Sequence, residues 1–144
     1  MNEAIENTPS HKRIHKWDLM VILPAAPFSD ESVSTALRFI DATASSGGRV
    51  LVWACGFATW LTQAGQPATK PSNAMDWSMD CPSPQRSVGD LLKRNAKTLT
   101  WVACRFCSEE RNFVNHLPAV RMKLAMQMAS CSKQALKTVT VGLT

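Results

Sequence analysis

Nearly continuous apolar runs alternate along this chain with segments whose apolar residues recur every three or four positions. The runs at 17–23, 49–54 and 99–103 predict strands that are buried on both faces. Two further strands are expected at 119–122 and 137–142. Five strands separated by helical segments predict an α/β fold, with an open, mostly parallel sheet and helices on both of its faces.

The segments between these strands carry helix signals. Ser29 or Asp30 is expected to cap the first helix, since both side chains accept hydrogen bonds from free backbone N–H groups. The apolar face of that helix consists of Val33, Ala36, Leu37, Ile40 and Ala44. A short helix is expected over 57–64, close to the end of the second strand.

Three more helices are expected in the second half of the chain. One covers 87–96, with Ser87 as its cap and Asp90 at a capping-box position. The next covers 104–113 and begins where the strand 99–103 ends. The apolar face of the last helix consists of Leu124, Met128, Cys131 and Ala135.

The carboxyl ends of the strands are where functional groups gather in an open parallel sheet. Three ends stand out: the loop 24–28, the pair Cys55-Gly56, and Cys104. All three are expected at one edge of the sheet, because parallel strands point the same way. The chain should form one domain over 17–144, preceded by a flexible basic extension over 1–16.

Composition narrows the class of protein. No apolar run approaches the ~20 residues of a spanning helix, and the acidic start of the chain lacks the apolar stretch of a secretory signal, so no membrane association is expected. Five cysteines, an odd and unevenly spaced number, argue against a disulfide framework and for working thiols in a reducing cytoplasm. The proline-rich segment 66–86 predicts a long loop, part of which, around Trp77, is expected to pack onto a surface.

Charge and loop motifs exclude several ligands. The net charge is +5, but lysines and arginines are scattered, so no direct contact with nucleic acid is expected. The basic cluster at 11–16 is interpreted as a solvated tail that helps to attract an anionic partner. The first strand ends in a Pro-Ala-Ala-Pro loop without phosphate-binding glycines, so no nucleotide or flavin cofactor is expected.

Cys104 is the strongest candidate for chemistry. It stands at a strand-to-helix junction, where free backbone N–H groups and the helix dipole favour a thiolate. The neighbouring Arg105 adds a positive charge, which should lower the pKa of the thiol further. Cys104 is therefore predicted to be a nucleophilic sulfur, with Arg105 and Cys107 as the other site residues.

The Cys104-x-x-Cys107 spacing admits three interpretations. Cys104 carries sulfur as a persulfide with Cys107 close by, or the two form a dithiol–disulfide couple. The third interpretation is half of a zinc site, but no second Cys-x-x-Cys or His pair follows, so no metal is expected. A buried, space-filling thiol is the simpler interpretation of Cys131 and, taken alone, of Cys107.

Five other polar or thiol positions are weaker candidates. Cys55 ends a strand on the reactive edge but also continues an apolar run, and Cys81 is interpreted as an exposed bystander in the long loop. His116 is interpreted as an uncoupled surface histidine rather than a proton donor to Cys104. Glu109, together with the next glutamate, is interpreted as a solvated helix face.

Several segments, in this order and spacing, are similar to a known family: 18–23, 36–38, 52–58 (Val-Trp-Ala-Cys-Gly-Phe-Ala), 61–66, 102–111 (Val-Ala-Cys-Arg-Phe-Cys-Ser-Glu-Glu-Arg) and 117–121. Over about 17–143 the chain resembles the DsrE/DsrF/TusD-like family of small sulfur-relay proteins. The resemblance implies a flavodoxin-like fold, assembly into homo- or hetero-oligomers, and transfer of sulfane sulfur through a cysteine persulfide toward tRNA thiolation or sulfur oxidation. The family's active cysteine corresponds to Cys104, and Cys107 to a second cysteine that only some members carry.

Some members of that family lack the active cysteine and serve as structural partners, and the loop with Cys81 and the basic extension depart from the family's pattern. The leading hypothesis is a cytoplasmic sulfur carrier or sulfurtransferase subunit, in which Cys104 receives sulfur from a donor protein and passes it to an acceptor protein. The alternatives are a thiol–disulfide redox protein that uses Cys104 and Cys107, and a non-catalytic oligomeric assembly module.

Overall fold

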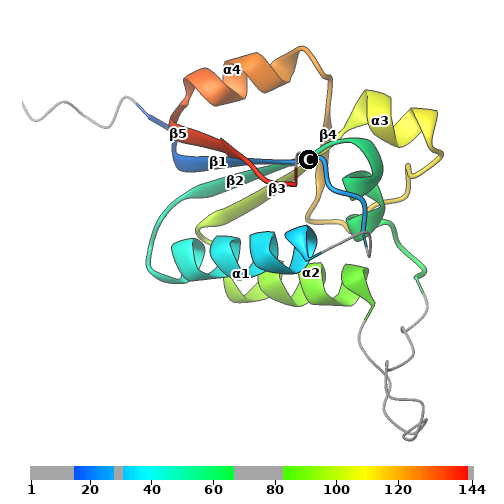
Figure 1. Ribbon diagram of the computed structural model, residues 1–144, viewed down its shortest axis with the longest axis horizontal. Helices are drawn as coiled ribbons and strands as arrows, with labels where there is room; N and C mark the ends of the chain where they lie inside the picture. Colours follow the sequence, from blue (N-terminus) through cyan, green and yellow to red (C-terminus); the bar gives the residue numbers. More distant parts are fainter. Residues whose placement is uncertain (1–14, 28–30, 67–82, 143–144) are drawn as a thin grey trace, which may run out of the picture.

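The structure is a computed structural model that describes residues 15–27, 31–66 and 83–142 (Figure 1). Its elements, in chain order, are β1 (Trp17–Leu23), α1 (Ser32–Ser45), β2 (Val50–Ala54), the 3-10 helix η1 (Gly56–Thr62), α2 (Pro84–Arg94), β3 (Leu99–Cys104), α3 (Arg105–Glu110), β4 (Arg121–Lys123), α4 (Gln127–Lys133) and β5 (Ala135–Thr140). The predicted caps Ser29 and Asp30, the extension as far as residue 14, and the loop residues Trp77 and Cys81 lie outside the described residues.

The five strands form one sheet in the order β4-β3-β2-β1-β5, and every neighbouring pair is parallel. This confirms the predicted α/β, flavodoxin-like fold class, with a sheet that is wholly rather than mostly parallel. Leu23, Ala54, Ala103 and Met122 stand side by side across four strands. The carboxyl ends of these strands therefore share one edge, as expected.

Helices cover the two faces of the sheet unequally. α1 and α2 lie side by side on one face, and the shorter α4 lies on the other (Figure 1). α1 buries Val33, Ala36, Ile40 and Ala44, four of the five residues of its predicted apolar face. On the α4 face, a smaller apolar layer includes Met20, Leu51, Trp53, Val102, Cys104, Cys131 and Ala135.

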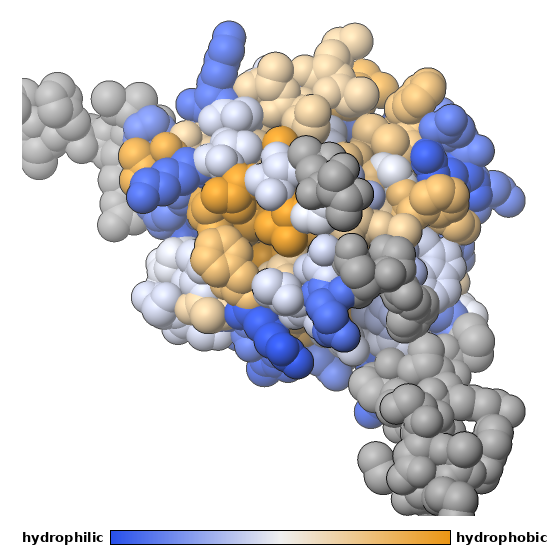
Figure 2. Space-filling model, viewed as in Figure 1, coloured by the Kyte–Doolittle hydropathy of each residue, from blue (hydrophilic) through white to orange (hydrophobic). Residues whose placement is uncertain are grey.

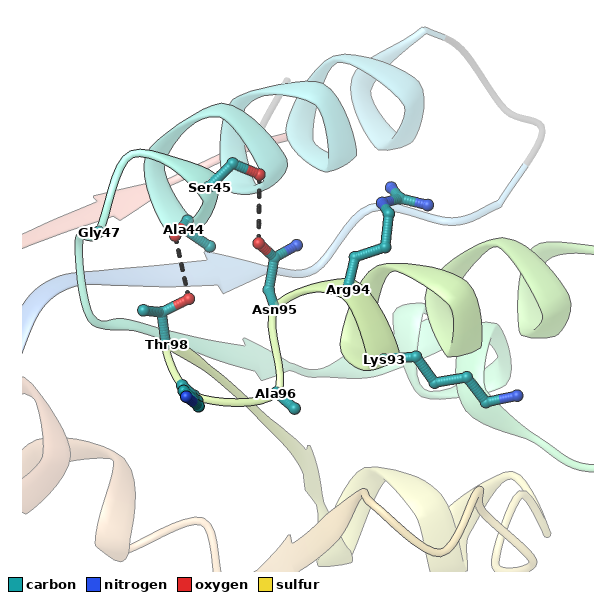
Figure 3. A pocket seen from close by; sticks show the side chains of 9 residues that line it. Ala44, Ser45, Gly47, Lys93, Arg94, Asn95, Ala96 and Thr98 are labelled. Carbon is teal, nitrogen blue, oxygen red and sulfur yellow. Dashed lines mark hydrogen bonds between the residues drawn. The ribbon is translucent and has the colours of Figure 1, made fainter.

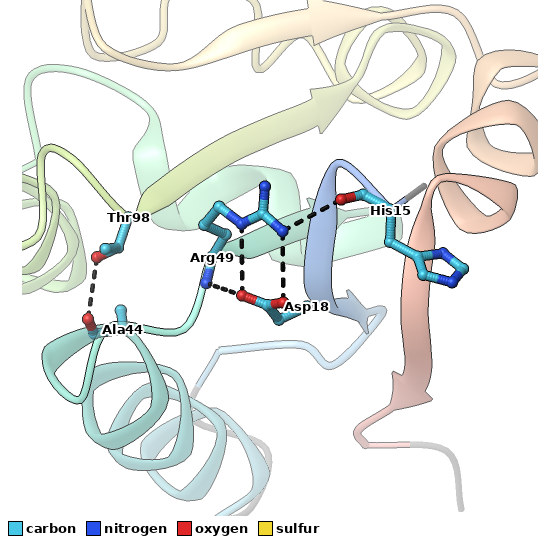
Figure 4. Close-up of polar contacts among 5 residues, drawn as sticks. All are labelled: His15, Asp18, Ala44, Arg49 and Thr98. Atoms are coloured by element: carbon cyan, nitrogen blue, oxygen red, sulfur yellow. Dashed lines mark hydrogen bonds and ion pairs between the residues drawn. The ribbon is translucent and has the colours of Figure 1, made fainter. Parts of the chain in front are cut away.

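An ion pair fixes the opposite edge of the sheet, where the strands begin (Figure 4). The backbone N–H of Arg49 donates to a carboxylate oxygen of Asp18 at 2.8 Å, and the Arg49 guanidinium lies 3.4 Å from the same oxygen. The guanidinium also donates to the carbonyl oxygen of His15 at 3.1 Å. These contacts join the start of β1 to the residue before β2.

The predicted capping of α2 is wrong. The cap is Ser83, whose hydroxyl accepts a hydrogen bond from the N–H of Arg86 at 3.2 Å, and Pro84 occupies the first turn. Proline suits this turn because its N–H is not needed there. Ser87 and Asp90 consequently lie inside the helix, and no capping box forms between them.

The boundaries of the last helix and the last strand also differ from those predicted. α4 ends at Lys133, and Ala135 begins β5 by pairing with Trp17, so Ala135 is not part of a helix face. Cys131 and Ala135 are both buried, but on successive elements, because the chain turns at Gln134. Their spacing of four residues imitates helix periodicity across that turn.

Candidate functional site

Cys104 is the last residue of β3 and the residue from which α3 begins. The predicted strand-to-helix junction is therefore confirmed. Its side chain lies on the α4 face of the sheet, in the same apolar layer as Val102 and Cys131, and only 3% of Cys104 is exposed. The thiol is thus at the carboxyl edge of the sheet but is covered by its neighbours.

Three thiols meet at this edge. Cys55 directly follows β2, and because Ala54 and Ala103 are register partners, Cys55 and Cys104 come next on neighbouring strands. Cys107, in the first turn of α3, shares a hydrogen bond with the thiol of Cys104. Cys55 and Cys107 are half-buried and pack against the same apolar layer as Cys104.

Gly56, the residue after Cys55, allows the chain to turn sharply at the end of β2. Gly56 has φ +58°, in the left-handed region that residues with a Cβ adopt only at a cost. The turn at Gly56 takes the chain from β2 into η1, and the hydroxyl of Thr59 stabilises it by donating to the Gly56 carbonyl at 2.7 Å.

The predicted lowering of the Cys104 pKa is wrong. Burial raises the pKa of this thiol, and its hydrogen bond with the Cys107 thiol raises it further. The backbone N–H groups of Cys107 and Phe106 act the other way, although no side-chain capping bond closes at Cys104. Burial, with the closeness of Cys107 and Cys104, also raises the pKa of Cys55, to about 11.

Arg105 does not face the thiols. Its guanidinium donates to the carboxylate of Glu109, one turn along α3, at 2.8 Å, and more than half of each side chain is exposed. Such a pair is solvated and adds little to stability. Arg105 is also not among the groups that shift the pKa of Cys104.

Arg111, and not Arg105, is the cation that lies beside the three thiols. It was not among the site residues predicted from the sequence. Its guanidinium stacks on the Phe57 ring at 4.7 Å and donates to the Cys107 carbonyl at 3.5 Å and to Glu110 at 2.8 Å. Its charge lowers the pKa of Cys55, against the larger effect of burial. The spacing of four residues from Cys107 to Arg111 was the available signal, because such residues share a helix face.

His116 is not the uncoupled surface residue that the sequence suggested. Its ring nitrogens lie 2.8 Å from the Thr62 hydroxyl and 3.0 Å from the Ser108 hydroxyl. Thr62 and Ser108 are fully buried, and burial lowers the pKa of His116, which favours the neutral ring. The histidine therefore joins the end of η1 to α3.

Two of the grooves in the described surface differ in their position relative to the thiols. An apolar groove of about 230 Å³ is lined by Ala26, Pro27, Phe57, Trp60 and Phe113. A polar groove of about 470 Å³ lies beside the carboxyl ends of α1 and α2 (Figure 3). There, Ser45 bonds to Asn95 at 3.1 Å and Thr98 to the Ala44 carbonyl at 3.0 Å. Neither groove is lined by a cysteine, but the apolar groove includes Phe57, on whose ring the Arg111 guanidinium stacks.

Within the described residues, no three histidine, cysteine, aspartate or glutamate side chains are placed to hold a metal ion. The three thiols of the cluster therefore do not converge as metal ligands do. Among the described helices, none has both the length and the apolar character that crossing a membrane requires.

Comparisons with known proteins support the fold. No family model and no curated protein matches this sequence. The structure is similar to that of the ychN protein from E. coli, with a TM-score of 0.69 over 86% of this chain and 98% of that protein. The sequence identity is 16%, so this similarity shows a common fold alone.

Proposed function

We propose that this chain is a sulfur carrier that holds sulfane sulfur as a persulfide on Cys104. The observation that carries the proposal is the cluster of three thiols at the carboxyl edge of a parallel sheet, with Cys104 at the strand-to-helix junction. The fold shared with ychN supports the DsrE-like resemblance at the level of fold.

The chemistry requires one thiolate and no oxidant. The Cys104 thiolate attacks the outer sulfur of a donor persulfide, R–S–SH. A new S–S bond forms at Cys104 while the donor's S–S bond breaks, the donor leaves as R–S⁻, and the proton stays on the transferred sulfur. Delivery to an acceptor thiolate is the same reaction in reverse, with Cys104 as the leaving thiolate.

The environment of Cys104 suits storage better than rapid turnover. Burial limits the contact of water with the loaded sulfur, which reduces its loss to side reactions. The raised pKa makes the thiolate scarce at neutral pH, so each transfer is slow. The N–H groups of Cys107 and Phe106 favour the thiolate whenever it forms.

Loading of cysteine variants tests the proposal. A Cys55→Ser/Cys107→Ser double variant, treated with inorganic polysulfide, should gain the mass of one sulfur atom on Cys104. The triple variant that also carries Cys104→Ser is the matched control and should lose this gain. The proposal is wrong if the double and triple variants load equally.

A dithiol–disulfide couple of Cys104 and Cys107 is the second candidate function. The hydrogen bond between the two thiols favours it, since it brings the sulfur atoms together on the first turn of α3. This function predicts a reversible Cys104–Cys107 disulfide with a defined reduction potential. A Cys107→Ser variant that loads sulfur as fully as the wild type would count against this second function.

Partners and location are also part of the proposal. Donor and acceptor proteins exchange sulfur with the carrier in the cytoplasm, and the carrier assembles with copies of itself or with related subunits. Apolar side chains make up part of the surface around α4 (Figure 2), and Phe106, Met126 and Leu136 are each more than half exposed. Sedimentation of the purified chain distinguishes assembly from a monomer.

A further inference from the structure

We propose that Cys55 is a second sulfur-carrying thiol, which accepts sulfane sulfur at the surface and passes it to Cys104. The inference rests on the proposed function, because it assumes that Cys104 is where the sulfur is held. It adds the site at which sulfur enters the protein, the cation that balances the thiolate there, and the order of the two transfers.

Exposure and register support this order. Cys104 is 3% exposed, so a bulky donor cannot bring its persulfide into line with that sulfur. Cys55 is half-buried at the end of the neighbouring strand, one position beyond the Ala54–Ala103 register pair. Neighbouring strands lie about 4.8 Å apart, which places the two thiols within a short side-chain movement of each other.

Arg111 is suited to hold negative charge at Cys55. Its side chain is 24% exposed, and its Nε is buried with no hydrogen-bond partner among the described residues. A buried donor without an acceptor is costly, and it is explained when an anion occupies the site during function. The stacking on Phe57, two residues after Cys55, fixes the guanidinium in place.

Two balanced transfers make up the route. The Cys55 thiolate attacks the outer sulfur of the donor persulfide, which leaves as R–S⁻, and Cys55–S–SH forms. The Cys104 thiolate then attacks the outer sulfur of Cys55–S–SH, so that Cys104–S–SH forms and Cys55 leaves as a thiolate beside Arg111. The proton stays on the transferred sulfur throughout, and no oxidant is consumed.

Donors of two sizes test this route in the full chain. With glutathione persulfide, a bulky donor, Cys55→Ser should slow the loading of Cys104 by about tenfold or more. With inorganic polysulfide, which is small enough to reach Cys104 directly, the same variant should load close to the wild-type rate. Cys131→Ala, which alters another thiol of the same apolar layer, is the control and should behave as wild type with both donors.

Variants at Cys104 and Arg111 separate this inference from the proposed function. In Cys104→Ser, sulfur should accumulate on Cys55, because the second transfer is blocked. Arg111→Gln should move the pH profile of Cys55 alkylation to higher pH, Arg111→Lys should restore it, and Arg121→Gln, on exposed β4, should leave it unchanged. The inference is overturned if Cys55 stays unloaded in Cys104→Ser or if Cys55→Ser loads from glutathione persulfide at the wild-type rate. A wild-type chain without sulfur on Cys104 would instead refute the proposed function.

Discussion

The raised pKa of Cys55 predicts that the protein loses stability in alkaline solution. Burial raises this pKa from 9.0 to about 11, so the folded state holds the thiol proton more tightly than the unfolded state does. The stabilising contribution is complete below about pH 9 and is lost as the pH rises through about 11.

The size of this loss follows from the change in pKa. A rise from 9.0 to about 11 corresponds to about 2.7 kcal/mol of unfolding free energy. Cys55 is only half-buried, so screening by solvent reduces the expected loss to about 1–2 kcal/mol.

Urea unfolding, followed by tryptophan fluorescence, measures this loss at about pH 8 and about pH 10.5. The comparison is between the wild type and Cys55→Ser, with Cys131→Ala as a control that retains the Cys55 thiol. The wild type and the control should lose about 1–2 kcal/mol more than Cys55→Ser over this interval. Equal losses in all three proteins would show that the alkaline sensitivity does not originate at Cys55.

Three further predictions concern the site and its scaffold. In a variant that keeps only the Cys104 thiol, the alkylation rate should still rise nearly tenfold per pH unit as the pH passes about 9, the ordinary pKa of a thiol; a rate that levels off at or below that pH would show an ordinary or lowered pKa. Gly56→Ala should cost about 1–2 kcal/mol of unfolding free energy because of its φ of +58°, and an unchanged midpoint in urea would contradict that conformation. Ser83→Ala should cost about 1 kcal/mol through the lost cap of α2, whereas Ser87→Ala should cost less; the reverse order would restore Ser87 as the cap.

Most of the fold could be predicted because strands that are buried on both faces have an apolar local sequence. The runs that became β1, β2 and β3 are apolar at almost every position, as a sheet covered on both faces requires. Strands are harder to predict where one face of the sheet is exposed to solvent. β4 has only three residues and is largely exposed, so its sequence carries little apolar signal.

The candidate site was predictable in position but not in environment. The junction at Cys104 follows from the end of an apolar run, whereas the burial of its thiol depends on packing on the α4 face, which no local pattern encodes. Arg105 is next to Cys104 in sequence, but it belongs to α3, and its side chain pairs with Glu109 one helical turn along. Arg111 is distant in sequence but shares a helix face with Cys107.

His116 illustrates the same difference between sequence and space. Its partners, Thr62 and Ser108, are 54 and 8 residues away, and an antiparallel bridge between Gln63 and His116 brings the segments together. A single histidine in a polar stretch gives no sign of such a bridge, because the pairing depends on where α3 ends relative to η1.

Locating the transferred sulfur on the chain tests most directly whether Cys104 carries it. Wild-type protein is exposed to a persulfide donor, its thiols and persulfides are alkylated, and the chain is cut with trypsin. Cleavage after Arg105 separates the peptide that ends in Val-Ala-Cys104-Arg105 from the one that carries Cys107. One additional sulfur atom is expected on the Cys104 peptide at the end of loading. Sulfur found only on the peptides of other cysteines would contradict this expectation.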